Sequence, residues 1–251
     1  MNPSQISRYP VTIDGEPAQI GTANELAIAL DVLHGREDRA VLEQLRAHLA
    51  EIVGGPVGFT NVMRSLEPEN QLYLIDAIGD QLAQVLQQAR YLRDLLATLA
   101  VSEVEQRLIE TLGGVGLRAI IITARDLAQA LEWIYGRSDQ RVLDLIGADY
   151  VRAIIRNGED LGLVLNALES AGQAALIEKI GWARVIELAQ NGRDLALLLR
   201  ALPSSQSAAL LDHFSREQLI ALIGNKIDWM YLYDRLEPAE VTSVLNKIGG
   251  K

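Results

Sequence analysis

Five acidic side chains recur at an interval of 34 residues, and their type and spacing could bind a divalent cation. Mg²⁺ and Ca²⁺ prefer carboxylate oxygens as ligands. A row of carboxylates on successive helices would also attract a basic peptide. The row consists of Asp76, Glu110, Asp144, Glu178 and Asp212.

A solvent-facing polar surface explains the same row without any ligand. Two carboxylates on helices stacked about 10 Å apart repel by about 0.4 kcal/mol in water, and salt screens this repulsion over about 8–10 Å. The solvated surface is therefore the preferred interpretation. A metal site at Asp144, Glu178 and Asp212 is the alternative.

The residue types needed for catalysis are scarce in this chain. Cysteine is absent, which excludes thiolate nucleophiles and cysteine-ligated zinc. The three histidines, His34, His48 and His213, do not have a metal-binding spacing, and His213 is expected to be a solvated residue. No glycine-rich phosphate loop, nucleophile elbow or zincin helix is present. The sequence therefore predicts neither an enzyme nor a cofactor.

Composition narrows the class of partner. The 251 residues include 33 acidic and 23 basic side chains, a formal charge of −10, so a nucleic-acid partner is not expected. A hydrophobic content of 49% predicts a folded globular protein. No apolar run approaches the roughly 18 residues of a membrane span, and we expect a cytoplasmic protein without membrane insertion.

Large aromatic residues between positions 133 and 182 stand where equivalent positions are small or charged. Exposed aromatic residues of this kind often anchor protein interfaces. Two nearby arginines could supply polar contacts around them. By contrast, Trp229 and Tyr233 align with leucines 34 and 68 residues earlier and are expected in the core. The predicted partner-binding residues are Trp133, Tyr135, Tyr150, Trp182, Arg152 and Arg184.

A 34-residue internal repeat must position all of these side chains. Similar segments end at Gly79, Gly113, Gly147 and Gly181, and aspartates keep the same interval at positions 126, 160, 194 and 228. Apolar spacing within one period predicts three short helices, each too short to be stable alone. The fold expected is an all-α, right-handed α-solenoid of about seven repeats in a single domain over residues 22–251.

The boundaries of these helices follow from their polar residues. Asp160 is expected to be the N-cap of a first helix. Gly181 should end the second helix, either as a left-handed residue or because another backbone approaches closely. Asn191-Gly192 is expected to stop the third helix.

Residues 1–21 do not resemble the repeats. Val11–Ile13 and Ala18–Ile20, joined through Asp14-Gly15, are typical of a strand pair with a tight turn. We expect this segment to cap the first repeat. Thr22 and Glu25 form a capping-box pattern that begins the first repeat helix.

Two short motifs connect the repeats to a known architecture. Leu66-Glu67-Pro68 and Leu236-Glu237-Pro238, together with the 34-residue period, resemble the short-helix superhelical domains that precede the pore of bacterial magnesium transporters. The resemblance covers the period and this short motif only, and it carries no residue roles. Tetratricopeptide repeats share the period, but their aromatic and small-residue positions are missing here.

These observations lead to three hypotheses about function. The preferred one is a non-catalytic scaffold or adaptor that binds another protein, with a basic segment as one kind of partner. The alternatives are a regulatory domain that senses divalent cations and an acidic inhibitor of a basic, nucleic-acid-binding protein.

Overall fold

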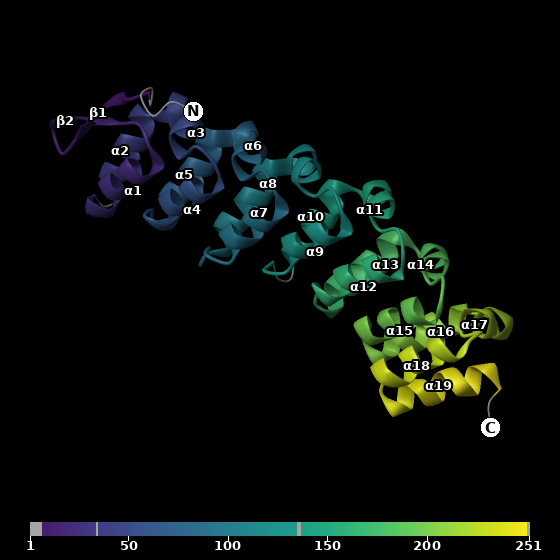
Figure 1. Ribbon diagram of the computed structural model, residues 1–251. Coiled ribbons are helices and arrows are strands. Elements are labelled where there is room, and N and C mark those ends of the chain that lie inside the picture. Colours follow the sequence, from purple (N-terminus) through teal and green to yellow (C-terminus); the bar gives the residue numbers. More distant parts are fainter. Residues whose placement is uncertain (1–6, 34, 135–136, 250–251) are drawn as a thin grey trace. The chain divides into compact units, whose positions relative to one another are not determined.

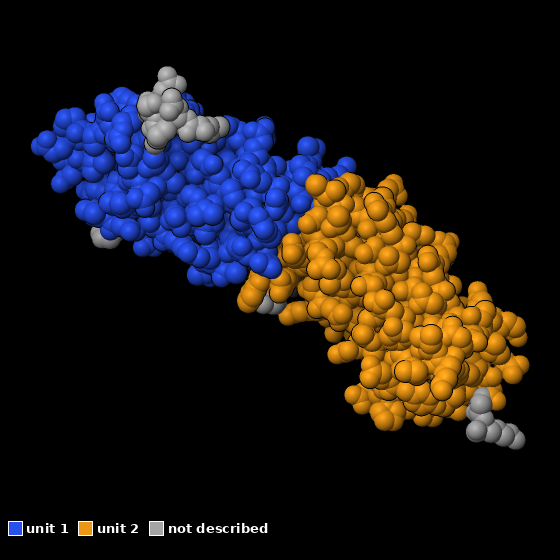
Figure 2. All heavy atoms as spheres, viewed as in Figure 1, with its two compact units in different colours: residues 1–121 blue, residues 122–251 orange. Residues whose placement is uncertain are grey.

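The chain is mostly helical and carries one small β-hairpin (Figure 1). The computed structural model describes residues 7–33, 35–134 and 137–249. The expectation of an all-α fold with a small N-terminal strand pair is confirmed. Contacts between Cα atoms divide the chain into two compact units, residues 1–121 and 122–251 (Figure 2). The predicted single repeat domain stays a prediction.

Unit 1 begins with the hairpin and continues with short helices. Its elements are β1 (Tyr9–Ile13), β2 (Glu16–Ile20), α1 (Ala23–Val32), α2 (Arg36–Gln44), η1 (Arg46–His48), α3 (Leu49–Val53), α4 (Pro56–Arg64), α5 (Pro68–Ile78), η2 (Gly79–Gln81), α6 (Leu82–Leu86), α7 (Ala89–Leu96) and α8 (Ser102–Ile120).

All secondary-structure elements in the described part of unit 2 are helices. Its elements are α9 (Ala124–Leu131), α10 (Arg137–Ile146), α11 (Ala148–Ile154), α12 (Gly158–Asn166), α13 (Ser170–Ile180), α14 (Trp182–Leu188), α15 (Gly192–Ala201), α16 (Ser204–His213), α17 (Arg216–Leu222), α18 (Lys226–Arg235) and α19 (Pro238–Ile248).

Helices one repeat apart pack against each other in unit 2. The first helices contact in the order α9, α12, α15 and α18, and the second helices α10 and α13 also contact each other. Leu161 in α12 and Leu195 in α15 are completely buried in this row. The first helices of unit 2 are therefore covered by their counterparts one period away, as marginal helices require.

Unit 1 follows the same packing rule. Helix α1 contacts α4, α4 contacts α7, and α5 lies between α2 and α8. The hairpin packs on α2: the Thr12 backbone N–H donates to the side-chain oxygen of Gln44 at 2.8 Å. The predicted turn is confirmed, because Asp14 and Gly15 both have positive φ angles, 49° and 82°, as a type I′ hairpin turn requires.

The hairpin is also fastened to α3 and η1 by Tyr9. Its ring stacks on His48 with centroids 3.9 Å apart, and its hydroxyl donates to Glu51 at 2.5 Å. This hydrogen bond raises the pKa of Tyr9 and lowers the pKa of Glu51, because it stabilises the neutral phenol and the charged carboxylate. The hairpin thus covers the start of unit 1.

The predicted N-cap at Asp160 is wrong by three residues. Asn157 is the N-cap of α12, and its side chain accepts from the Asp160 backbone N–H at 2.8 Å. Asp160 occupies N3, where its carboxylate accepts from the Arg156 backbone N–H. Asn191 likewise begins α15 rather than ending α14. Aspartate favours both positions near a helix N-terminus, so the pattern alone did not distinguish them.

Gly181 connects α13 and α14 with a backbone that other residues adopt only under strain. Its φ is +81° and its ψ is 143°, and a Cβ atom added there would meet nothing within 4 Å. The dihedral angles therefore explain this glycine, and close approach of another backbone does not. Gly79, Gly113 and Gly147 at the equivalent places also have positive φ.

We expect Gly181→Ala to lower the free energy of unfolding by about 1–2 kcal/mol, because an alanine must adopt the disfavoured positive φ. Gly162→Ala is the matched control: Gly162 is helical, and an added Cβ would lie at an ordinary 3.5 Å from Leu197. The control should be neutral or gain up to about 1 kcal/mol from helix propensity. Urea denaturation followed by circular dichroism measures both, and equal losses in the two variants would contradict this explanation.

Buried polar side chains close the ends of the first helices in unit 2. The Gln173 amide of α13 donates to the carbonyls of Leu165 and Leu168, where α12 ends, and to Ala201 O at the end of α15. One repeat later, the Ser207 hydroxyl donates to Leu199 O at 2.8 Å. These side chains satisfy carbonyls that a helix C-terminus leaves without partners.

Glycine allows the first helices to approach closely at their N-termini. In α12 and α15 the first residue is glycine, and it packs on the N3 aspartate of the following first helix. A Cβ added to Gly158 would lie 2.5 Å from Asp194 Cβ, and one added to Gly192 would lie 2.4 Å from Asp228 Cβ. The Gly192 backbone N–H also donates to Asp228 Oδ1 at 3.2 Å.

Candidate functional site

The predicted aromatic anchors lie in different settings. Trp133 follows α9 with 45% of its surface exposed, and Tyr150 in α11 is half-buried. Tyr135 lies outside the described residues. Trp182 begins α14 and is half-buried.

Trp182 contacts the next repeat. Its ring stacks on His213, the last residue of α16, with centroids 4.9 Å apart and an interplanar angle of 29°. It also lines an open hollow of about 430 Å³ together with Ile177 and Gln206. Part of its surface is thus used in packing between neighbouring repeats, and part faces the hollow.

The two predicted arginines bind neighbouring helix ends. Arg152 donates from Nε to Ile180 O at 3.2 Å and from Nη2 to Lys179 O at 3.0 Å, which places its charge at the C-terminus of α13. Arg184 donates to Glu187 at 3.0 Å and to Ile155 O at 3.5 Å. A cation at a helix C-terminus is favourable, so both side chains stabilise contacts within unit 2.

Lysines from the following repeat neutralise two members of the acidic row. Lys179 Nζ lies 2.7 Å from Asp144, and Lys247 Nζ lies 2.9 Å from Asp212. Glu178 is exposed and lines the hollow beside Trp182. In residues 7–33, 35–134 and 137–249, no three histidine, aspartate or glutamate side chains are grouped closely enough to hold a metal ion.

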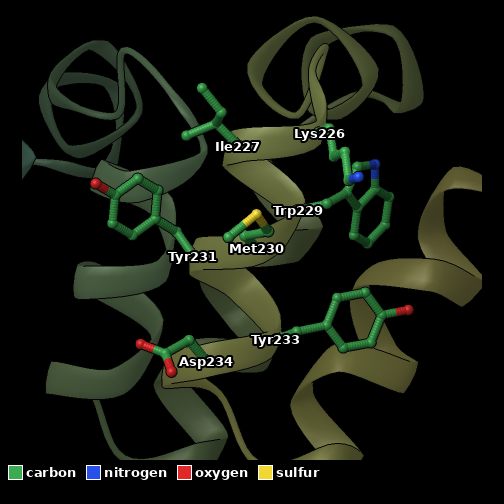
Figure 3. A pocket seen from close by; sticks show the side chains of 7 residues that line it. All are labelled: Lys226, Ile227, Trp229, Met230, Tyr231, Tyr233 and Asp234. Carbon is green, nitrogen blue, oxygen red and sulfur yellow. The ribbon is translucent and has the colours of Figure 1, made fainter.

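The outer face of α18 combines apolar exposure with a large hollow. Ile227 is 64% exposed, and Met230 and Tyr233 are each 61% exposed. They lie around an open hollow of about 820 Å³, with Met230 between the two ends of the helix (Figure 3). We call this set the α18 face; it consists of Lys226, Ile227, Trp229, Met230, Tyr231, Tyr233 and Asp234.

The prediction that Tyr233 belongs to the core is wrong. The equivalent Leu165 in α12 and Leu199 in α15 are completely buried, because the next first helix covers them. Trp229 is only half-buried, whereas its equivalent Leu195 is completely buried. Within the described residues no helix follows α18 in this row, so its outward side chains remain exposed.

Three aromatic residues of the α18 face contact other side chains that restrict them. The rings of Trp229 and Tyr233 lie 5.9 Å apart at an angle of 35°. On the other side of Met230, the guanidinium groups of Arg193 and Arg235 lie 6.0 Å and 5.9 Å from the Tyr231 ring. These contacts restrict the aromatic side chains and lower the entropy cost of binding against them.

The charged residues of the α18 face are exposed, whereas the aspartate between the first helices α12 and α15 is buried. Asp194, which packs against Gly158, is largely buried, and burial raises its pKa even though the Gln190 backbone N–H donates to it. Lys226 and Asp234 are both exposed. Within the described part of the chain, neither of them takes part in an ion pair.

The α18 face was not among the predicted sites, although the sequence contained a signal for it. Two sets of positions 34 residues apart carry this signal: the first is Ala124, Gly158, Gly192 and Lys226, and the second is Ala128, Gly162, Ala196 and Met230. In both sets the side chain changes from small to long at α18. This change distinguishes α18 from the earlier first helices of unit 2.

Comparison with known proteins gives no family for this chain. No family model matches the chain, and no curated protein has significant similarity to it. In the described residues, no helix combines the length and apolar character needed to cross a membrane.

Proposed function

We propose that this protein is a non-catalytic interaction scaffold that binds another protein through the α18 face. The proposal includes a right-handed α-solenoid of about seven 34-residue repeats as its architecture and the cytoplasm as its location. The observation that carries it is the exposure of Ile227, Met230 and Tyr233 side by side on one helix.

The chemistry of the α18 face supports a protein partner. Methionine and aromatic residues are enriched at protein interfaces, and a methionine side chain adapts its shape to a partner surface. Large exposed apolar patches on folded proteins commonly mark such contacts. The charged groups Lys226 and Asp234 lie at the edges of the patch, where interfaces are usually polar (Figure 3).

The repeat architecture has support inside each unit. Helices separated by one period contact each other in the order α9, α12, α15, α18 in unit 2 and α1, α4, α7 in unit 1. Arrays of this kind bury apolar columns between modules and leave their terminal modules different from the rest. Lys226 and Met230 depart in the same way from the small residues at the equivalent places of α12 and α15.

We prefer the α18 face to the surface predicted around Trp182. Trp182 is stacked on His213, and Arg152 is bonded to the carbonyls that end α13. Both already have a packing role. The cation-sensing alternative is weakened in the same way, because lysine side chains already form ion pairs with Asp144 and Asp212.

Site-specific photocrosslinking tests the proposal in the native cells. A benzoylphenylalanine at position 230 should form a defined crosslinked protein product, and the added substitution Tyr233→Asp should reduce its yield at least about tenfold, since a charge disrupts an apolar contact. The matched control carries the same probe at position 220 in α17, where Ile220 is 47% exposed outside the α18 face.

Three results would contradict the proposal. The first is absence of a product at position 230. The second is a product whose yield does not respond to Tyr233→Asp. The third is a product obtained only with the probe at position 133, which would favour the surface predicted around Trp133 and Trp182.

A further inference from the structure

We infer that the α18 face binds a second copy of this chain through the exposed side of the copy's α1, with the two helices parallel. This inference rests on the proposed function and specifies its partner. It follows from the register in which first helices pack on one another, and from the sides of α1 and α18 that this packing leaves open.

Successive first helices pack in a fixed parallel register. The first helical residue, N1, lies against N3 of the following first helix: a Cβ added to Gly158 in α12 would lie 2.5 Å from Asp194 Cβ in α15. Further along the same pair, N5 lies against N6, because a Cβ added to Gly162 would lie 3.5 Å from Leu197 Cβ. The contacts advance in the same direction along both helices. N1 and N5 of a first helix therefore face the following one, whereas N3 and N6 face the preceding one.

The side of α18 that would face a following first helix is open. Positions N1, N5 and N8 lie on this side, and the residues there in α12 and α15 are all buried: Gly158, Gly162, Leu165, Gly192, Ala196 and Leu199. The residues at the same positions of α18, Lys226, Met230 and Tyr233, are all exposed. A helix that continued the row would cover them.

The side of α1 that would face a preceding first helix is open in the same way. The opposite side is occupied by α4, because a Cβ added to Gly58 at N3 of α4 would lie 2.7 Å from the Cβ of Ala23 at N1 of α1. Ile28 at N6 is 57% exposed and Val32 at N10 is 76% exposed, so the hairpin, which packs on α2, leaves both uncovered. We call the open set the α1 face; it consists of Glu25, Ile28, Ala29 and Val32.

Joining these two open sides continues the row of first helices from one copy into the next. The register of unit 2 places Met230 at N5 of α18 against Ile28 at N6 of the copy's α1. One turn later, Tyr233 lies beside Val32. All four side chains are exposed in the single chain, and this contact removes them from water together.

Opposite charges meet at the start of the two helices. The register places Lys226 at N1 against Glu25 at N3 of the second copy, where in the contact of α15 with α18 an N1 backbone N–H donates to an N3 carboxylate. The Gly21 backbone N–H donates to Glu25 and lowers its pKa, so this carboxylate is charged. Arg8 lies 2.8 Å from one of its oxygens, and 33% of the Glu25 side chain remains exposed. Lys226 has no ion pair in the described part of the chain.

Residue sizes favour α1 over a helix like those of unit 2 as the occupant. In the contact of α12 with α15, the N5 residue is the small Gly162 and the N7 residue is Leu198, and both are buried. The contact between copies reverses this order, with Met230 at N5 and Ala29 at N7. A leucine at N7 would compete with Met230 for space, whereas the alanine leaves room for it.

The expected association is weak. Two ten-residue helices cover less than the roughly 1,200–2,000 Å² of stable complexes, so we expect a dissociation constant of about 10–100 µM with rapid exchange. Sedimentation velocity over a range of about 1–300 µM should show self-association that increases with protein concentration.

Two variants that each block one face test whether unlike faces pair. Ile28→Asp blocks the α1 face and Met230→Asp blocks the α18 face, and each should weaken self-association at least about tenfold because a charge enters an apolar contact. An equimolar mixture should associate about as tightly as the wild-type protein, since each mixed pair keeps one intact α18 face and one intact α1 face. These complexes should stop at the dimer, because their two remaining faces are blocked.

Introduced cysteines test the register, since the chain has no cysteine of its own. Met230→Cys mixed with Ile28→Cys and oxidised glutathione should form a disulfide-linked dimer at least about tenfold faster than either variant alone. Mass spectrometry should find the disulfide between positions 230 and 28. Val57→Cys is the matched control for Ile28→Cys, because Val57 is 65% exposed in α4 outside both faces.

The charge pair is tested by Lys226→Glu, which should weaken association about threefold to tenfold by placing two carboxylates together. An acidic residue at the start of α18 suits the helix dipole, so the fold should be kept. Arg125→Glu is the matched control: it makes the same change of charge in the first turn of α9, on an exposed residue outside both faces. Circular dichroism and thermal unfolding confirm that each variant is folded.

The inference is overturned if the wild-type protein stays monomeric to about 300 µM, if mixing Ile28→Asp with Met230→Asp does not restore association, or if position 230 crosslinks to itself rather than to position 28. A product at position 230 in cells that contains a different protein would overturn the second copy and leave the proposed function intact. Association of the purified mixture without any crosslink in cells would support the contact between copies and contradict the proposed function.

Discussion

Leu165→Ala should lower the free energy of unfolding by about 2–5 kcal/mol, whereas Tyr233→Ala should change it by no more than about 0.5 kcal/mol. The two residues occupy the same position of the first helix, two repeats apart. Leu165 is completely buried, so its truncation leaves a cavity; Tyr233 is 61% exposed and loses little. The difference measures how much a covering helix contributes.

Chemical denaturation at about 1 µM protein checks this pair, because a low protein concentration keeps any contribution from intermolecular association small. The ordering of the two variants is the decisive result. A loss of several kcal/mol in Tyr233→Ala at that concentration would mean that other parts of the same chain cover the α18 face, and it would remove the basis for binding there.

Gly58→Ala should destabilise unit 1 by about 3 kcal/mol, at the upper end of the cost of overpacking. A Cβ at this place in α4 would meet the backbone oxygen of Val53 and, at 2.7 Å, the Cβ of Ala23 in α1. A backbone oxygen cannot rotate away as a side chain can, so α1, α3 and α4 must move apart.

Val57→Ala is the control, because Val57 precedes Gly58 in the same helix and is 65% exposed. It should change the free energy of unfolding by no more than about 0.5 kcal/mol. Thermal and urea unfolding of both variants report the difference. A Gly58→Ala protein as stable as wild type would show that the contact between α1 and α4 yields without cost.

The repeat interval was predictable because each helix must bury one side. Gly181 and the leucines around it recur at 34 residues, and the helices and their positive-φ connections appear where that interval places them. The hairpin turn at Asp14-Gly15 was predictable as well, since few residue pairs tolerate its dihedral angles.

Other features could not be predicted, because some residues suit more than one position in a helix and because burial depends on helices elsewhere in the chain. Asn157 and Asp160 are both good residues for a helix start, and only the hydrogen bonds show that the asparagine is the N-cap. Tyr233 aligns with buried leucines, but alignment reports an environment only where the covering helix is also present. The partners of Arg152 and Lys179 lie a repeat apart, which the pattern along one helix does not reveal.

The polar contacts between repeats of unit 2 join residues only 27 to 36 positions apart, from Arg152 with Lys179 to Gly192 with Asp228. Bringing such residues together closes a loop of nearly constant, modest length at every junction, whatever the total length of the chain. Low contact order of this kind accompanies rapid folding. The protein can therefore begin to fold at any of several junctions and extend from there, and a damaged junction would leave partly folded chains in which the modules beyond it have lost a neighbour.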